Sequence, residues 1–296
     1  MQKRYQHRQE VIAFLQNHLS GRQWHLTRPA SGRGHETYIA HSHGDSYFVK
    51  VGATVSNYQI MAAVDLTPAV ILSGHLDDGT SILVQPYING RNPSWQDFRH
   101  YRPSIAAVVN KTHHNSALKS ILAVGRSETY KEAGETAVKH IQQKWALYRS
   151  QLPGVADYID ETLAQLKWEA QRFIGGGLVA SHNDICSGNW LITTAGKVYL
   201  VDLEMMSLDD PAHDMGALLW WYYSPELRSG FLESAGYQYD NAFKNRMRVR
   251  MALHCLNIIL PREQSFDSFD AGSFAERLTD FRAVLAGKEN PRGYVD

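Results

Sequence analysis

The 296-residue sequence is poor in several features that would assign it to a particular class of protein. It has only two cysteines, Cys186 and Cys255, which argues against a secreted scaffold held by disulfides. No segment approaches the run of about 20 apolar residues that a spanning helix needs. The first residues also lack the apolar run of a signal peptide. We therefore expect a cytoplasmic protein that does not associate with a membrane.

The sequence also has no excess of charge of one sign. Lys plus Arg and Asp plus Glu number 30 each, and no run of like charges stands out. Nucleic acid is therefore not a favoured partner. Internal repeats and low-complexity tracts are absent as well. The length is sufficient for one two-lobed domain or two small ones.

The most informative segment that is present is Ser181–Glu204, which reads SHNDICSGNWLITTAGKVYLVDLE. It contains His-x-Asp, then Asn189 five residues after Asp184, and it ends in Asp-x-Glu. A kinase needs such a set: one carboxylate to accept a hydroxyl proton, and an amide and a second carboxylate to hold Mg²⁺. Asp184 and Asn189 lie on one tight loop, so we expect them to face opposite sides of one phosphoryl group.

The residues after this loop predict a β-hairpin. Leu191–Thr193 and Val198–Leu203 are apolar runs separated by a turn that contains Gly196. The hairpin would bring Asp202 close to Asn189, so that two oxygen ligands converge on one cation. If the second strand continued, Asp202 and Glu204 would share one of its faces.

The two parts of the chain differ in their periodicity. Up to about residue 88, short strand patterns are mixed with helical patterns near the N-terminus and at Thr54–Leu66. Beyond residue 88 helical periodicity dominates, and the hairpin is the only strand signal. Ser116–Tyr130 is interpreted as a flexible insertion. We predict an α+β protein with a small β-rich lobe at residues 1–88 and a larger helical lobe at residues 89–296, and a ligand site between such lobes is common.

Two sequence blocks carry a resemblance to a known family. SHNDICSGNW and VDLEMMSLDDPAHDMG are similar to the catalytic block of the aminoglycoside phosphotransferase and choline kinase superfamily, whose members share the protein-kinase fold. Weaker similarities are SGRGHETYIA to the phosphate-covering loop, YFVKV to the strand with the nucleotide lysine, and ILVQPYING to the hinge strand. Asn183 resembles the choline kinase branch more than the aminoglycoside branch. The resemblance covers roughly residues 31 to 223 and implies a bilobal protein-kinase-like fold.

The resemblance implies a role for individual residues in an enzyme that uses ATP and Mg²⁺. Asp184 would be the catalytic base, and Asn189 and Asp202 would hold Mg²⁺. His182 and Asp214 would brace the catalytic loop through its backbone. The nucleotide would be bound by Lys50, Gly32, Gly34, Gln85 and Tyr87.

The substrate side is suggested by Glu204 and by the aromatic run Trp220–Tyr223. Glu204 could hold a second metal, touch a cationic substrate or cap a helix. In choline kinases the helix after Asp-Pro-x-x-Asp helps to line the choline pocket, and aromatic rings attract ammonium groups. Trp220 and Tyr223 are therefore predicted substrate contacts, with ordinary core packing as the alternative.

One feature departs from the family pattern. Kinases of this fold pair the strand lysine with a glutamate on the following helix. Between Lys50 and Asp65 the sequence has no acidic residue, and Thr54, Asn57 or Gln59 stands where the glutamate is expected. Either a polar side chain substitutes for it, or the protein is a degenerate kinase.

Three hypotheses follow. The first is an ATP-dependent kinase that phosphorylates a hydroxyl of a small alcohol: choline or ethanolamine, an amino sugar, thiamine or an aminoglycoside. The second is a degenerate, kinase-fold nucleotide-binding module without turnover. The third is a non-haem iron site formed by His182, Asp184 and His213 or His254, a set that leaves Asn189 and Asp202 without a role.

Overall fold

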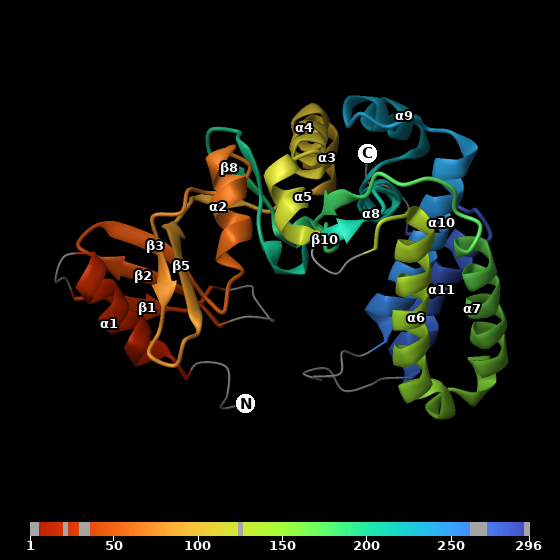
Figure 1. Cartoon of the computed structure of the whole chain (residues 1–296), viewed down its shortest axis with the longest axis horizontal. Coiled ribbons are helices and arrows are strands. Elements are labelled where there is room, and N and C mark those ends of the chain that lie inside the picture. The colour runs from red at the N-terminus through yellow and green to blue at the C-terminus, as the bar shows by residue number, and fades with distance from the viewer. Residues whose placement is uncertain (1–5, 20–22, 30–35, 124–126, 261–270, 293–296) are drawn as a thin grey trace. The chain divides into compact units, whose positions relative to one another are not determined.

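The computed structural model describes residues 6–19, 23–29, 36–123, 127–260 and 271–292 (Figure 1). Two compact units make up the structure. The first comprises Met1–Asn92 together with Gly188–Met205, and the second comprises Pro93–Ser187 and Met206–Asp296. The predicted boundary after residue 88 assigns the segment Gly188–Met205 to the other part, and the functional division into lobes remains a prediction.

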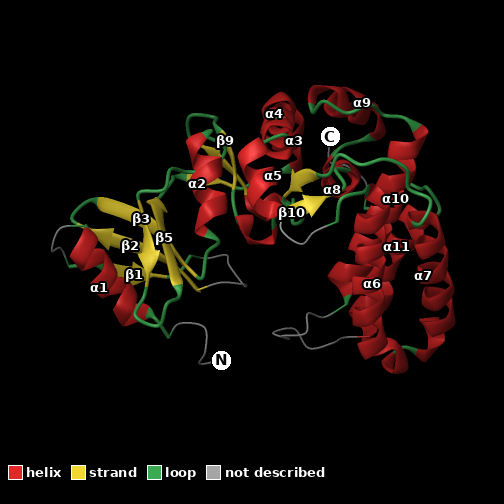
Figure 2. Ribbon diagram, in the orientation of Figure 1, coloured by secondary structure: helices red, strands yellow, loops and turns green. Residues whose placement is uncertain are grey.

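The first unit is rich in strands (Figure 2). Its helices are α1 (Arg8–His18) and α2 (Val55–Ala63). Its strands are β1 (His25–Thr27), β2 (Glu36–Ser42), β3 (Asp45–Val51), β4 (Leu72–His75), β5 (Ser81–Pro86), β6 (Gly90–Arg91), β8 (Trp190–Thr193) and β9 (Val198–Leu200). A short 3-10 helix follows at Leu203–Met205.

Five of these strands form an antiparallel sheet in the order β1-β2-β3-β5-β4. Side chains alternate between the faces of a strand. Val49 and Val51 of β3 pack with Val11 and Leu15 of α1 in one buried apolar cluster. Lys50, between the two valines, therefore points to the opposite face, where it meets Tyr58 of α2.

The second unit is mainly helical. Its helices are α3 (Trp95–His100), α4 (Arg102–His113), α5 (Ser116–Leu122), α6 (Tyr130–Tyr148), α7 (Ala156–Ala170), α8 (Ala212–Tyr222), α9 (Pro225–Ser234), α10 (Asn241–Ile259) and α11 (Ala271–Leu285). Helices α6, α7, α10 and α11 lie side by side (Figure 1). Its two strands, β7 (Val179–Ser181) and β10 (Ser207–Asp209), form an antiparallel pair. This distribution is the predicted α+β class.

Two expectations about the sequence after residue 88 are wrong. The predicted flexible insertion at Ser116–Tyr130 contains helix α5, which begins where the Asn115 side chain accepts a hydrogen bond from Leu118 N. The hairpin is not the only strand structure after residue 88, because β6 pairs with β8 and β7 pairs with β10. Within the described ranges, none of the helices combines the length and the apolar character that crossing a bilayer requires.

Candidate active site

The hairpin β8–β9 places Asn189 and Asp202 at its open end. Trp190 pairs with Leu200, and Val201 N donates to Asn189 O at 2.9 Å. The two predicted Mg²⁺ ligands therefore follow directly from the pairing of the strands between them. Asp202 has a left-handed backbone with φ of 64°, a conformation that Asp and Asn tolerate better than other residues with a Cβ.

Lys50 has its charged group beside this hairpin. Its side chain is 5 % exposed, and its Nζ donates to Asp202 Oδ1 at 2.5 Å and to Glu204 Oε2 at 2.5 Å. A third hydrogen bond runs to Tyr58 Oη at 3.0 Å. Lys50 has no carboxylate partner on the next helix, but it has two carboxylate partners, Asp202 and Glu204, in the hairpin segment.

Glu204 lies inside the unit and does not present a free carboxylate to a ligand. Its side chain is 8 % exposed, and Tyr58 donates to its Oε1 at 2.9 Å. Burial and the hydrogen bond with Asp202 raise the pKa of Glu204 to about 7, although Lys50 acts in the opposite direction. The expected strand through these carboxylates is wrong. The left-handed Asp202 ends the extended chain, and a 3-10 helix begins at Leu203.

The donor atoms at the hairpin suit a hard divalent cation. Asn189 and Asp202 offer amide and carboxylate oxygens, and the Asp202 side chain is 44 % exposed. Mg²⁺ prefers oxygen ligands and is usually held by one or two carboxylates plus substrate phosphates. Among the described residues, no three His, Cys, Asp or Glu side chains are grouped to hold a metal. The residues present therefore fit a cation whose other ligands come from phosphates and water, and this role remains a prediction.

The loop that carries Asp184 is held by Asp214 of α8 in the second unit. Asp214 Oδ2 accepts from His182 N at 2.7 Å, and its Oδ1 accepts from Asn183 N at 2.9 Å. His113 of α4 lies 3.0 Å from Oδ2. Burial would raise the pKa of Asp214, but the His113 hydrogen bond and the nearby histidines hold this pKa well below its usual range. The carboxylate can therefore brace the loop in its charged form.

Asp184 itself is half-buried at the end of this braced turn. Its N–H donates to His182 Nδ1 at 3.3 Å, so His182 acts on the backbone, as its predicted structural role requires. Asn183 has φ of 62°, and its side chain bonds Ser207 Oγ and His213 Nδ1. Both ends of the turn are thus fixed by polar contacts within the unit.

Tyr222 holds the far end of the same loop. Ser187 N donates to Tyr222 Oη at 2.8 Å, and the Tyr222 ring stacks on Phe98 at a centroid distance of 4.1 Å. The aromatic run in the sequence predicts substrate contacts at Trp220 and Tyr223 and assigns no role to Tyr222. A tyrosine in such a run gives no signal of the backbone N–H that its hydroxyl will meet.

The two predicted substrate contacts in the run, Trp220 and Tyr223, are packed inside the second unit. Trp220 is 8 % exposed, and Tyr223 is fully buried with its hydroxyl donating to Phe98 O at 3.0 Å. Ordinary packing, the alternative named above, accounts for both side chains in this structure. The pKa of the Tyr223 hydroxyl is raised, mainly by burial.

The other predicted nucleotide contacts differ in how accessible they are to a ligand. Gln85 is buried, and its side chain donates to Pro68 O at 2.6 Å. Tyr87 is 47 % exposed, and its N–H already donates to Ser46 O. A purine could therefore use the Tyr87 carbonyl or ring, but not this N–H. Gly32 and Gly34 lie outside the described residues.

The histidines of the iron hypothesis have other partners. His213 Nδ1 lies 2.9 Å from Asn183 Oδ1 and 3.3 Å from Asp209. His254 is half-buried, and desolvation lowers its pKa to about 3. These contacts support the polar framework of the second unit.

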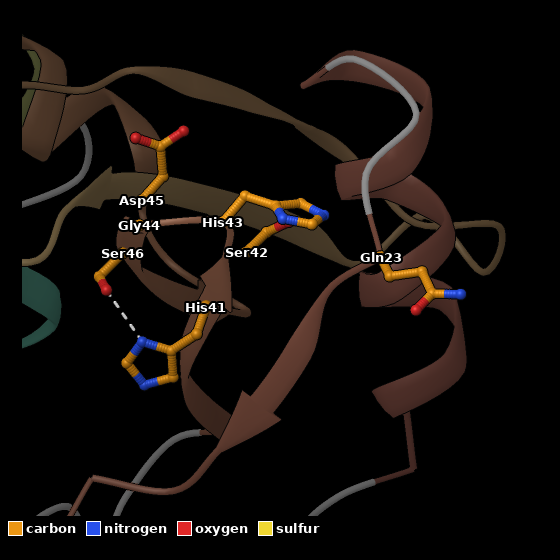
Figure 3. A pocket seen from close by; sticks show the side chains of 7 residues that line it. All are labelled: Gln23, His41, Ser42, His43, Gly44, Asp45 and Ser46. Atoms are coloured by element: carbon orange, nitrogen blue, oxygen red, sulfur yellow. Dashed lines mark hydrogen bonds between the residues drawn. The ribbon is translucent and has the colours of Figure 1, made fainter.

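A surface hollow of about 360 Å³ lies at the turn between β2 and β3 (Figure 3). It is lined by polar side chains, including His41, whose Nδ1 is 2.9 Å from Ser46 Oγ. Lys50 pairs with Thr37, at the opposite end of this hairpin. The hollow is therefore separate from the lysine cluster, and its lining suggests no catalytic group.

Comparison with known families gives a match over most of the chain. The sequence model of the phosphotransferase enzyme family matches residues 12–252. The matched range includes Lys50, Asp184, Asn189 and Asp202.

Solved structures with similar folds come from related groups of enzymes. A choline/ethanolamine kinase family protein from Mesorhizobium loti has a TM-score of 0.68 at 19 % identity, and the alignment covers 96 % of each chain. A spectinomycin phosphotransferase, solved with ADP and spectinomycin, has a TM-score of 0.62 at 17 % identity, covering 94 % of this chain and 93 % of that one. A choline kinase from Cryptosporidium parvum has a TM-score of 0.66 at 12 % identity, covering 95 % and 97 %. These similarities concern the fold.

Proposed function

Because the chain belongs to the phosphotransferase enzyme family, we propose that it transfers the γ-phosphoryl group of ATP to a hydroxyl of a small metabolite that carries an amine or ammonium group. The family membership makes the chain a phosphotransferase. The observation that carries the finer proposal is the buried Lys50, whose ammonium group bonds the carboxylates of Asp202 and Glu204. Strand lysines of this kind meet the nucleotide phosphates in kinases.

The first unit would supply nucleotide binding. Lys50 would contact the α- and β-phosphates, and Asn189 and Asp202 would hold Mg²⁺, which neutralises charge on the phosphates when bound. Asp202 is the more exposed of the two carboxylates beside Lys50, so it is the one accessible to a cation.

The second unit would supply the base. The acceptor oxygen forms a bond to the γ-phosphorus while the bond to the β,γ-bridging oxygen breaks, and ADP leaves with that electron pair. The hydroxyl proton passes to the Asp184 carboxylate. The bonds from Asp214 and His182 to the loop backbone keep the base in place, so that positioning provides much of the rate acceleration.

The acceptor class is supported by the similar proteins. Their names include choline and ethanolamine kinases and a phosphotransferase for spectinomycin. Choline or ethanolamine, an amino sugar, thiamine and an aminoglycoside are therefore the candidates to test first.

The test is a panel of these alcohols with Mg-ATP, in which ADP release and the phosphorylated product are both measured. We expect turnover with at least one acceptor, and Asp184→Asn should lower kcat by about 10²–10⁴-fold, the usual contribution of a general base. Asp45→Asn, at the end of the β2–β3 hairpin away from Lys50, is the control and should leave kcat unchanged. No acceptor-dependent ADP release above the Asp184→Asn background would contradict the proposal.

The contacts of Lys50 remove the observation that suggested a degenerate, kinase-fold nucleotide-binding module. That hypothesis depended on a lysine without a carboxylate partner, and Lys50 has two. Mg-ATP at 100 times its dissociation constant should stabilise a binding protein by about 2.7 kcal/mol. A thermal shift of that size without turnover of any acceptor would restore this hypothesis.

A further inference from the structure

We propose that Tyr58 of α2 is a positioning residue that replaces the helix glutamate of other kinases and, together with Glu204, orients Lys50 toward the nucleotide phosphates. This inference rests on the proposed function. It assigns a role to a residue that sequence reasoning passed over, because a tyrosine on the apolar face of a helix ordinarily indicates core packing.

The hydrogen-bond capacity of Tyr58 is fully used. A phenol has one donor and two acceptor lone pairs. Lys50 Nζ and Leu203 N can only donate, so both must use the lone pairs, at 3.0 Å and 3.2 Å. The hydroxyl hydrogen must therefore go to Glu204, whose Oε1 lies at 2.9 Å. Each group has a fixed direction in this set: the Tyr58 hydroxyl accepts from the lysine and donates to the carboxylate, from a ring that is held in the core.

The Lys50 ammonium group is satisfied in the same way. It has three N–H donors, and it has three acceptors in Asp202, Glu204 and Tyr58. Tyr58 is 2 % exposed and the Glu204 side chain 8 % exposed, whereas the Asp202 side chain is 44 % exposed. A phosphate oxygen that replaces Asp202 would leave the two buried partners in contact with Lys50.

Helix α2 also holds the segment that carries the carboxylates. Asn57 Nδ2 donates to Leu203 O at 2.9 Å, while Tyr58 Oη accepts from Leu203 N. Two successive residues of the helix thus bind both backbone groups of the residue between Asp202 and Glu204. In other kinases one helix carboxylate orients the lysine. In this protein the Tyr58 hydroxyl on α2 and the Glu204 carboxylate, in the segment that α2 holds, would share that function.

The test compares two tyrosines that are both buried and both bonded to a glutamate. Tyr58→Phe should weaken ATP binding about tenfold, as expected for the loss of one hydrogen bond to a charged group. The tenfold weakening should be seen in the dissociation constant of ATP, measured by calorimetry in EDTA, and in the KM of ATP. The change in kcat should be smaller. Tyr38→Phe is the matched control. Its hydroxyl donates to Glu36 at 2.5 Å within the same unit, on the face away from Lys50, so ATP binding should not change.

A double variant separates positioning from general stability. If Tyr58 acts through Glu204, then Tyr58→Phe with Glu204→Gln should bind ATP no more weakly than the weaker single variant. Equal ATP affinity in the wild type, Tyr58→Phe and Tyr38→Phe would overturn this inference while leaving the proposed function intact. Loss of ATP affinity in Tyr38→Phe equal to that in Tyr58→Phe would also overturn it. Failure of the wild type itself to bind ATP would contradict the proposed function instead.

Discussion

At the scale of single residues, two of the four non-glycine residues that have a left-handed backbone in the described ranges lie in the proposed site. Asn183 and Asp202 have φ of 62° and 64°, and each lies next to a residue of the proposed chemistry or belongs to it. A left-handed backbone costs free energy, of order 1–3 kcal/mol, and persists only where surrounding contacts over-determine it. Asn183 has such contacts in Asp214, Ser207 and His213. The backbone direction at Asn183 is therefore fixed by these side chains, next to the proposed base Asp184.

His7 gives a prediction at this scale about stability and pH. Its Nδ1 lies 2.8 Å from Glu36 and its Nε2 lies 3.0 Å from Asp78. Burial alone would lower the pKa of His7, but the hydrogen bonds with the two carboxylates outweigh it and raise the pKa above 6.5. The imidazolium therefore contributes stability that is fully present below the unfolded-state pKa and is lost as pH rises through the folded-state pKa.

His7→Gln should accordingly lower the free energy of unfolding by roughly 1.5–3 kcal/mol near pH 5.5, the range for hydrogen bonds to charged groups, and by clearly less near pH 9. Urea unfolding at both pH values measures the difference. His140→Gln, on the exposed side of α6, is the control and should show no such pH dependence. An equal loss of stability at both pH values in His7→Gln would refute the charge pairing.

The catalytic candidates were predictable at this scale, but their supporting residues were not. Asp184, Asn189 and Asp202 have a spacing that the chemistry requires, and the hairpin brings Asn189 and Asp202 together as predicted. Tyr58, His113 and Tyr222 each bond a partner far away in sequence, namely Glu204, Asp214 and the Ser187 N–H. No periodicity or spacing encodes such contacts, because they depend on how elements pack.

At the scale of elements, the accuracy of prediction followed the strength of the local signal. An apolar run limited by a turn and a proline predicts a strand over Ser81–Pro86, and β5 has these bounds. The apolar periodicity predicts a helix over Gly134–Ser150. Helix α6 instead begins at Tyr130, because Thr129 and Glu132 form a capping box that the apolar pattern does not reveal. Strands β7 and β10 have three residues each, too few for alternation to be recognised.

The packing of α8 on α10 predicts that a glycine-to-alanine substitution at their contact lowers the stability of the protein, whereas it usually raises the stability of a helix. Ala is ordinarily better than Gly in a helix by about 1 kcal/mol. At Gly216 of α8, however, a Cβ would lie 3.0 Å from the Met247 carbonyl oxygen of α10. Gly216→Ala should therefore destabilise the protein by roughly 1–3 kcal/mol, as overpacking does. Thermal unfolding measures the change.

Gly230 provides the matched control on α9. A Cβ there would have no atom within 4 Å. Gly230→Ala should consequently raise the melting temperature, by a stabilisation of about 0.4–1 kcal/mol. If both variants were stabilised alike, the close approach of α8 and α10 would not constrain the helix pair.

At the scale of the whole molecule, the first unit is assembled from two separate stretches of sequence. Gly188–Met205 joins the N-terminal part through the pairing of β6 with β8 and the bond from Leu200 N to Leu66 O. An ion pair between Lys197 and Asp65 adds to this attachment. The family match and the similar structures agree with the predicted protein-kinase-like class, but no local pattern predicts that a hairpin from a mainly helical half belongs to the other unit.

Residues 1–92 alone should therefore fail to fold. Strand β6 would lose its partner β8, and α2 and Lys50 would lose their hydrogen bonds to Asp202–Glu204; several lost hydrogen bonds are a large part of the stability of a small domain. A fusion of residues 1–92 to 188–205 through a short Gly-Ser linker should fold, because Asn92 Nδ2 lies 3.0 Å from Gly188 O. The dispersion of amide signals in a two-dimensional NMR spectrum distinguishes the outcomes. A well-dispersed spectrum from residues 1–92 alone would show that the hairpin is dispensable.

The divided first unit also has a consequence during synthesis on the ribosome. Its N-terminal stretch emerges first, but the carboxylates that neutralise Lys50 emerge only when the chain has been translated as far as Met205. At about 5–20 residues per second, this delay is on the order of ten seconds. During that interval Lys50 of β3 lacks both carboxylates, and β6 lacks β8, the strand with which it pairs. The nascent chain is therefore most in need of a chaperone in this interval, before the nucleotide-binding lysine has found its partners.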